Sequence, residues 1–355
     1  MILKQWIGTS RYVYNKALDT AKKLGKYNFY TLRNKVVTAK NNDNIKSWEL
    51  ETPKDVRAGA VKDMTIAFSA AMTNLKRRNI SSFKLGFRSK KLESSIVIPK
   101  SAIEIHKHSV CIYKRYLGHI KTSKDKVLNN LKIDHDCRLK NDKGRWFLYI
   151  PVKEKMVNNE IPQHGVCALD PGVRKFQTVY SEYETKKIII DKEILKTLLS
   201  KLDTFQSLRS KKEISKSHYV RRHSKLQFRL SNLIDDLHYK TISYLIRTYD
   251  TIFLPSFESQ ELVRKNKSKI CRRNMLTMKH YTFKQRFIHK CDYALNTNLF
   301  ICTEEYTSKT CSRCGLLNDV KSSEVYSCKR CNLVMDRDIN GARNILIKSL
   351  QEQSG

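Results

Sequence analysis

Four cysteines near the end of the chain have the spacing of a tetrahedral metal site. Two Cys-x-x-Cys pairs are separated by thirteen residues, and their members are Cys311, Cys314, Cys328 and Cys331. Structural zinc is bound by four thiolates at about 2.3 Å, and Gly315 directly after the first pair suits a knuckle turn that needs positive φ. Four thiolates leave no open coordination position, so the sequence predicts a structural zinc ribbon and not a catalytic zinc.

Two aspartates stand where carboxylates could hold a second, harder metal. Asp170 ends an apolar run before Pro171-Gly172, and Asp338 begins a helix-like run just after the cysteine pairs. Taken singly, Asp170 is as often a turn former and Asp338 an N-cap. Together, strand-end acids in a basic protein are what two-metal phosphodiester hydrolysis requires, since carboxylates hold two ions about 3.5 to 4 Å apart.

The charge balance favours a polyanionic partner. Lysine and arginine number 69 against 34 acidic residues, which gives a formal net charge of +35 over 355 residues. Each neutralised phosphate releases counterions, so such an excess suits nucleic acid. The alternative is a solvated lysine surface without a polyanion partner. The 40% hydrophobic content excludes a disordered polyelectrolyte.

The remaining cysteines and the apolar runs indicate an intracellular protein. Six cysteines stand singly in apolar or mixed segments, which favours buried thiols in a reducing compartment. No apolar run approaches the roughly 20 residues of a membrane span, and no apolar signal core precedes the first basic helix.

Alternating helices and strands must position these residues. A helix is predicted over 9–24, a second opens at Thr52-Pro53-Lys54-Asp55, and a long one has its apolar face between Leu226 and Tyr244. Short strand-like runs occur at 95–98, 110–113, 146–150, 251–254 and 299–302, and 165–180 reads as strand, turn and strand. This alternation predicts an α/β core.

Three blocks resemble the split RuvC motifs and inserted zinc ribbon of the TnpB family of transposon-encoded nucleases. They are Asp170-Pro-Gly-Val, the segment from Tyr306 to Gly315 and the segment from Asp336 to Ile345; Arg11-Tyr-Val-Tyr-Asn15 extends the likeness. The pattern is closest to Fanzor-like members of eukaryotes and viruses. The resemblance implies an RNA-guided, magnesium-dependent DNA endonuclease of a mobile element, with guide RNA and target DNA as partners and no small-molecule substrate or membrane.

The resemblance also assigns catalytic positions. Asp170 matches the first catalytic aspartate and Asp338 the last, whereas Asp336 is interpreted as a turn residue. With a middle glutamate, these acids would bind magnesium, and the four cysteines would bind zinc.

The middle acid departs from the family pattern. The usual strand-end glutamate falls near Pro255, which cannot bind metal. Glu304 and Glu258 are the two possible replacements. Glu304 is favoured because a neighbouring strand end can aim a carboxylate inward without re-threading its own strand.

The fold implied by the resemblance is an α/β, RNase H-like (RuvC) core with an inserted zinc ribbon, preceded by a helical recognition region and a small β-rich wedge-type domain. The expected divisions are 1–80 for the helical region, 81–160 for the wedge-like domain, 161–310 for the nuclease core, 311–333 for the ribbon, and 334–355 for the last RuvC motif with the C-terminal helix.

Two other functions stay open. Family members carry one or more wedge strands before the helix with Arg11, yet ten residues precede it here, so a truncated start is expected. Together with Pro255, this allows a catalytically impaired, zinc-containing nucleic-acid-binding remnant or regulator of transposition. A strand-transferring transposase would use the same acids but needs end recognition, for which the sequence has no signal.

Overall fold

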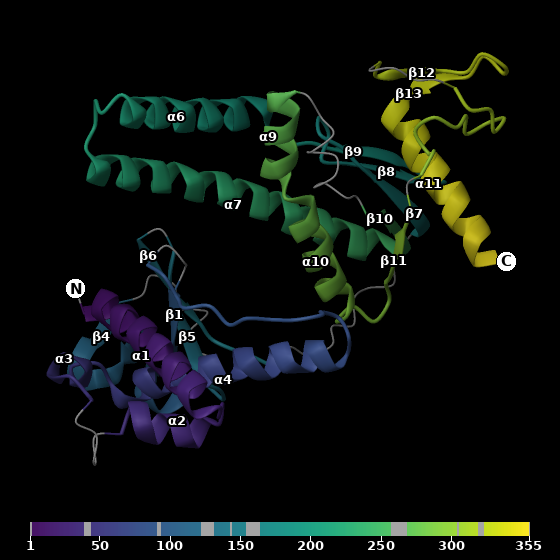
Figure 1. Ribbon diagram of the computed structural model, residues 1–355. Coiled ribbons are helices and arrows are strands. Elements are labelled where there is room, and N and C mark those ends of the chain that lie inside the picture. Colours follow the sequence, from purple (N-terminus) through teal and green to yellow (C-terminus); the bar gives the residue numbers. More distant parts are fainter. Residues whose placement is uncertain are drawn as a thin grey trace. The chain divides into compact units, whose positions relative to one another are not determined.

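The chain forms two compact units, Met1–Lys153 and Glu154–Gly355 (Figure 1). The computed structural model describes residues 2–38, 44–90, 94–121, 131–142, 144–153, 164–256, 268–303, 305–318 and 323–354. No helix in these ranges combines the length and apolar character needed to cross a membrane.

Unit 1 begins with four helices: α1 (Ile2–Leu24), α2 (Phe29–Val36), α3 (Ser47–Leu50) and α4 (Lys54–Lys76). α1 buries Val13, Ala17 and Ala21, which are spaced by four residues, against Val61 and Met64 of α4. The predicted opening of α4 after Pro53 is confirmed. α1 starts seven residues earlier than the predicted 9–24, because its first turns also pack: Trp6 is fully buried.

Two three-stranded antiparallel sheets complete unit 1. One has the order β1-β5-β6 (Ser94–Ile98, Cys137–Asp142, Arg145–Tyr149), and the other has the order β2-β3-β4 (Ile103–His106, Ser109–Ile112, His119–Lys121). Short helical turns lie at Lys100–Ala102 and Tyr113–Leu117. Trp6 of α1 and Val56 of α4 join strand residues Ile96 and Leu139 in one core, so helices and strands of this unit stabilise one another.

A five-stranded mixed sheet organises unit 2. Its order is β11-β10-β7-β8-β9, with bounds Asn298–Cys302, Tyr249–Pro255, His164–Pro171, Gln177–Ser181 and Thr185–Ile188. β10 runs parallel to both β7 and β11, whereas β8 is antiparallel to β7 and β9. The predicted strands at 165–180, 251–254 and 299–302 are confirmed. The carboxyl ends of β7, β10 and β11 therefore meet at one edge of the sheet.

Helices cover both faces of this sheet. Cys167 and Leu169 face a core completed by α7 (Lys216–Thr248), α9 (Lys269–Met278) and α10 (His280–Cys291). The predicted long apolar helix is α7, and α6 (Lys192–Ser210), which the sequence did not reveal, packs against it as a hairpin (Figure 1). On the other face, Ala168 packs with Ile345 of α11 (Arg337–Ser354).

A small two-stranded sheet, β12 (Val325–Ser327) and β13 (Val334–Asp336), follows the first cysteine pair and brackets the second. β13 continues directly into α11. The cysteine segment is thus joined to the helix that carries Asp338.

Candidate functional site

Asp170 lies at the carboxyl end of β7 and faces α11. It shares the pleat direction of Val166 and Ala168, the side that packs on α11, because alternate strand residues point to one face. A Cβ atom added at Gly341 of α11 would lie 2.8 Å from Asp170 Oδ2. The carboxylate therefore approaches the helix backbone closely, and a glycine leaves the room for it.

Asp338 lies in the first turn of α11, three residues before Gly341. Residues three apart on a helix are neighbours, with Cβ atoms about 5 to 6 Å apart. Asp170 therefore reaches α11 one turn beyond Asp338, so the structure brings these two predicted acids to one end of the sheet.

Asp336 has the turn role that the sequence indicated. Its Oδ1 accepts hydrogen bonds from the backbone N–H groups of Asp338 at 2.9 Å and Ile339 at 3.3 Å. It therefore caps α11, and the alternative in which Asp338 is the N-cap is wrong. Asp338 is left with its carboxylate available for other partners.

Lys175 binds both acids at the start of α11. Its Nζ lies 2.7 Å from Asp338 Oδ2 and 2.9 Å from Asp336 Oδ2, and Lys187 adds a contact of 2.8 Å to Asp336. Burial would lower the pKa of Lys175, but the hydrogen bonds to the two aspartates outweigh it and raise the pKa. Burial would likewise raise the pKa of Asp336, yet the two lysines lower it to about 2. Lys175 and Lys187 therefore already balance the negative charge of Asp336 and Asp338.

A buried histidine holds the loop between Asp170 and Lys175. His280 Nε2 donates to the carbonyl oxygen of Gly172 at 3.1 Å, and its ring stacks on Phe176. A side chain at Gly172 would meet Lys175 O at 2.8 Å, so the turn is tight. The loop that carries the first acid and the lysine is thus fixed by packing.

The pairing of β10 with β7 shows where the middle acid of the family pattern would lie. β10 pairs with β7 through Phe253 and Ala168, and counting on by two residues brings Pro255 level with Asp170. Adjacent strands lie about 4.8 Å apart, so an acid at Pro255 would flank Asp170. Pro255 in turn pairs with Cys302 of β11. Both proposed replacements, Glu304 and Glu258, lie outside the described residues.

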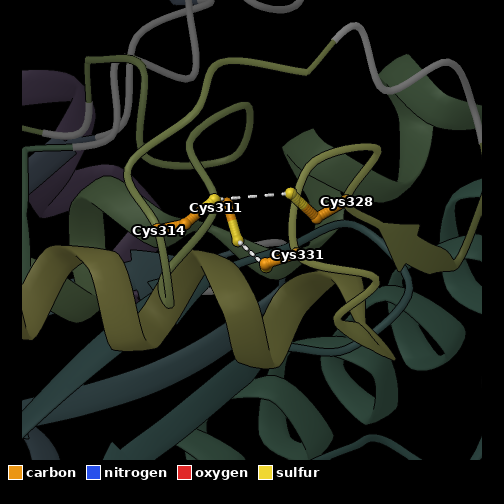
Figure 2. Close-up of side chains that lie close together, drawn as sticks. All are labelled: Cys311, Cys314, Cys328 and Cys331. Atoms are coloured by element: carbon orange, nitrogen blue, oxygen red, sulfur yellow. Dashed lines mark hydrogen bonds between the residues drawn. The ribbon is translucent and has the colours of Figure 1, made fainter.

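The four cysteine sulfur atoms converge from two loops (Figure 2). All four Sγ atoms lie within 4.8 Å of one another, and Cys311–Cys331 and Cys314–Cys328 are each 3.6 Å apart. This is too long for a disulfide but close to the roughly 3.8 Å edge of a tetrahedron with 2.3 Å zinc–sulfur bonds. Within the described ranges, these cysteines are the only group of three or more possible ligands with metal-binding proximity.

Both knuckle turns have the backbone that such a site needs. Gly315 has φ of +75°, as predicted, and Asn332 takes the equivalent place after the second pair with φ of +53°. The backbone amide of Cys331 lowers the pKa of the Cys328 thiol to about 6, whereas burial raises the pKa of the Cys331 thiol to about 12. Cys328 therefore ionises more readily than Cys331, and zinc binding would deprotonate both. The donor set and geometry therefore fit a structural zinc ion.

Comparisons with known proteins agree with this arrangement. A family model described as Cas12f1-like, TNB domain matches residues 280–345. Over the whole chain, the sequence is 30% identical to a putative transposase of Paramecium bursaria Chlorella virus 1, of which it covers 85%. It is 27% identical to a TnpB-like protein of Acanthamoeba polyphaga mimivirus, across 97% of this chain and 70% of that protein.

One solved structure shares the fold. A Cas12f1 chain in a complex with sgRNA and target DNA superposes with a TM-score of 0.58 at 15% identity, covering 97% of this chain and 82% of that chain. At this identity the likeness concerns the fold alone. The viral relatives, of which the first is covered almost throughout, show that this chain belongs to the TnpB family.

Sequence reasoning missed three side chains at this site. Lys175 lies two residues after the Asp170-Pro-Gly-Val block, and Asn340 and Asn344 lie inside the Asp336 block, four residues apart on α11. The i, i+4 spacing of two amides on a helix was the available signal. Their partners are distant in sequence, so local patterns did not reveal them.

Proposed function

We propose that this chain is an RNA-guided, magnesium-dependent DNA endonuclease of the TnpB/Fanzor type, encoded by a mobile element. The observation that carries the proposal is the approach of the Asp170 carboxylate to α11 at Gly341, one turn from Asp338, in a member of the TnpB family. Two acids from segments far apart in sequence thus lie near the same part of α11, on a strongly cationic chain.

Magnesium would be held by Asp170, Asp338 and Glu304, with Glu258 as the alternative third ligand. Carboxylate oxygens are the ligands that magnesium prefers. In two-metal sites the bound ions supply an activated water and stabilise the leaving oxygen. The chain's own contribution is to hold the acids at one sheet edge and to cap the helix start with Asp336.

The mixed sheet with helices on both faces supports an RNase H-like (RuvC) core, and the converged cysteines support a zinc ribbon inserted before the last acid. The nuclease core would span 161–310, the ribbon 311–333, and the last RuvC motif with the C-terminal helix 334–355. In unit 1, 1–80 would be the helical recognition region and 81–160 the wedge-like domain. The polar contacts of Asn15 with Arg88 N at 2.8 Å and Arg88 O at 3.0 Å hold the two regions together.

Guide RNA and target DNA are the proposed partners. The net charge of +35 supports a polyanion, and the Cas12f1 chain of the same fold was solved with sgRNA and target DNA. An intracellular location is part of the proposal, because the six cysteines outside the cluster are buried or half-buried, as expected of thiols in a reducing compartment.

A remnant that binds nucleic acid without cutting it is the second candidate. Pro255 favours it, because the strand position level with Asp170 cannot supply a ligand. Loss of one acid would leave zinc binding and charge intact. The two candidates therefore differ in cleavage and agree in binding.

The test begins with RNA that copurifies with the full chain expressed beside its native flanking DNA. Sequencing should reveal one defined RNA species, and DNA matching its variable end should be cut when magnesium is present. A heterogeneous RNA population would contradict guidance. A defined RNA without cleavage would favour the remnant.

A further inference from the structure

Two buried amide side chains join α11 to the first zinc knuckle. Asn340 Nδ2 donates to Thr310 O at 2.8 Å, and Asn340 Oδ1 accepts from Ser312 N at 3.1 Å. Asn344 Nδ2 donates to Thr310 O at 2.6 Å and to Thr307 O at 2.8 Å. Asn340 is fully buried and Asn344 is 7% exposed, so water does not replace these bonds.

The partners of this amide pair bracket the metal ligand Cys311. Thr310 O precedes that cysteine and Ser312 N follows it. Buried backbone groups that lose a hydrogen-bond partner are costly, so the position of the knuckle and that of the helix are mutually dependent. The amide pair therefore holds the backbone in place on both sides of one zinc ligand.

A second connection links the other knuckle to the same helix turn. β12 leads into Cys328, and its Val325 pairs with Asp336 at the end of β13. The N–H of Arg337 donates to Glu324 O at 2.9 Å. Both knuckles are thus attached to the first two turns of α11.

The same part of α11 carries Asp338 and is approached by Asp170 at Gly341. Asp338 and Gly341, the contact point of Asp170, lie roughly a third of a turn around the helix from Asn340 and Asn344. One side of the helix therefore binds the cysteine segment while another side meets β7. A shift of the helix on the cysteine side must move Asp338 relative to Asp170 on β7.

We propose that Asn340 and Asn344 are positioning residues that couple the metal-filled state of the four-cysteine cluster to the geometry of the Asp170–Asp338 pair. Zinc in the cluster holds the first knuckle, the amide pair holds α11 to that knuckle, and the acids keep their separation. Loss of zinc then weakens divalent metal binding at the acids. This inference rests on the proposed magnesium site and adds its control by zinc.

The test measures Mn²⁺ affinity at the acids by electron paramagnetic resonance on the full-length chain, with zinc content determined in parallel. Binding is taken as the part abolished by Asp170→Asn. Removing zinc from the unaltered chain should weaken Mn²⁺ binding by about 5- to 150-fold, the usual range for coupled sites. The Asn340→Leu/Asn344→Leu variant, with zinc still bound, should already be weakened within that range.

A matched control is Asn15→Leu, which removes another amide that binds backbone, far from the cysteines in sequence. It should leave Mn²⁺ affinity unchanged. Wild-type affinity in a zinc-loaded double variant, or no effect of zinc removal on the unaltered chain, would overturn the coupling. A chain in which Asp170→Asn abolishes no Mn²⁺ binding would instead refute the proposed magnesium site.

Hydrogen exchange keeps the inference testable if the double variant does not fold. In the unaltered chain, removal of zinc should speed exchange of the amides of 337–344 but not those of β10. Unchanged exchange in 337–344 would overturn the proposal.

Discussion

Lys175 places a positive charge where the acids would receive a divalent ion. Its ammonium group contacts Asp338 at 2.7 Å and Asp336 at 2.9 Å, and its side chain is 15% exposed. Lys187 also contacts Asp336, so Asp336 keeps a cationic partner without Lys175. Lys175 contacts Asp338 and would compete there with a divalent ion. In the chain without magnesium, this contact reduces the repulsion between the carboxylates of Asp336 and Asp338.

Replacing Lys175 with methionine should tighten metal binding. A charge-assisted contact at a partly exposed acid is worth about 1 kcal/mol, so Lys175→Met is expected to raise Mn²⁺ affinity roughly fivefold. Calorimetric titration of the full chain measures this.

Arg174→Met is the matched control, because it removes the neighbouring charge, which pairs with Glu324 at 2.5 Å and not with the acids. Its Mn²⁺ affinity should stay unchanged. An unaltered or weaker affinity in Lys175→Met would show that the lysine does not compete for the site.

The third acid can be identified by a pair of conservative substitutions. Altering a residue that only supports a metal ligand costs about 10- to 100-fold, so loss of a ligand itself should cost at least about 100-fold. Glu304→Gln is therefore expected to reduce cleavage by that factor, whereas Glu258→Gln should keep it. The reverse ranking would transfer the role to Glu258.

At the scale of elements, the buried His238 on α7 makes unit 2 sensitive to acid. Burial lowers its pKa from 6.5 to about 4, and its Nε2 donates to Met278 O at 2.9 Å. As the pH falls, His238 is protonated in the unfolded chain at a higher pH than in the folded chain. The contribution to stability is therefore complete above about pH 6.5 and is lost as the pH falls towards 4.

Urea unfolding between pH 7 and pH 4 measures this loss. The His238 contribution should have a slope of at most about 1.4 kcal/mol per pH unit, and His238→Gln should remove it while keeping a donor for Met278 O. His289→Gln, an exposed histidine on α10, should keep the slope. Parallel pH curves for His238→Gln and the unaltered chain would contradict this account.

The elements differ in how much of them the sequence could predict. β7 and β10 read as continuous apolar runs because they are buried in a sheet covered on both faces. β11 is also an apolar run, although this edge strand leaves Phe300 and Ile301 exposed. α6 gave a weaker local signal, since its buried Leu198 and Leu202 form a small cluster with Leu226 of α7, formed by the hairpin. The basic stretch from Arg209 to Arg222 contains the end of α6, the turn and the start of α7.

The sequence offered candidate ligands for the site but not the residues that support them. Cysteine spacing and strand-end aspartates follow chemical rules that are visible in one dimension. Lys175 and Asn344 act through contacts with residues 163 and 37 positions away, namely Asp338 and Thr307. Such contacts exist only after the sheet and α11 have packed.

At the scale of the whole molecule, charge should dominate binding to nucleic acid. With a net charge of +35, several lysines and arginines will contact phosphates at once. A protein with 6 to 10 phosphate contacts loses about 10³- to 10⁵-fold in affinity between 50 and 200 mM salt. Fluorescence anisotropy with an unrelated duplex should show a decrease in that range, and a decrease below about tenfold would contradict a phosphate-binding surface.

Cleavage by the RNA-bound chain tests the central claim most directly. Guide-matched DNA should be cut with magnesium present, and Asp170→Asn and Asp338→Asn should each reduce the rate by at least about 100-fold while zinc content stays unchanged. Asp236→Asn, an acid of α7 paired with Lys240, is the control and should cut normally. Equal cleavage by Asp170→Asn and the unaltered chain would contradict the account.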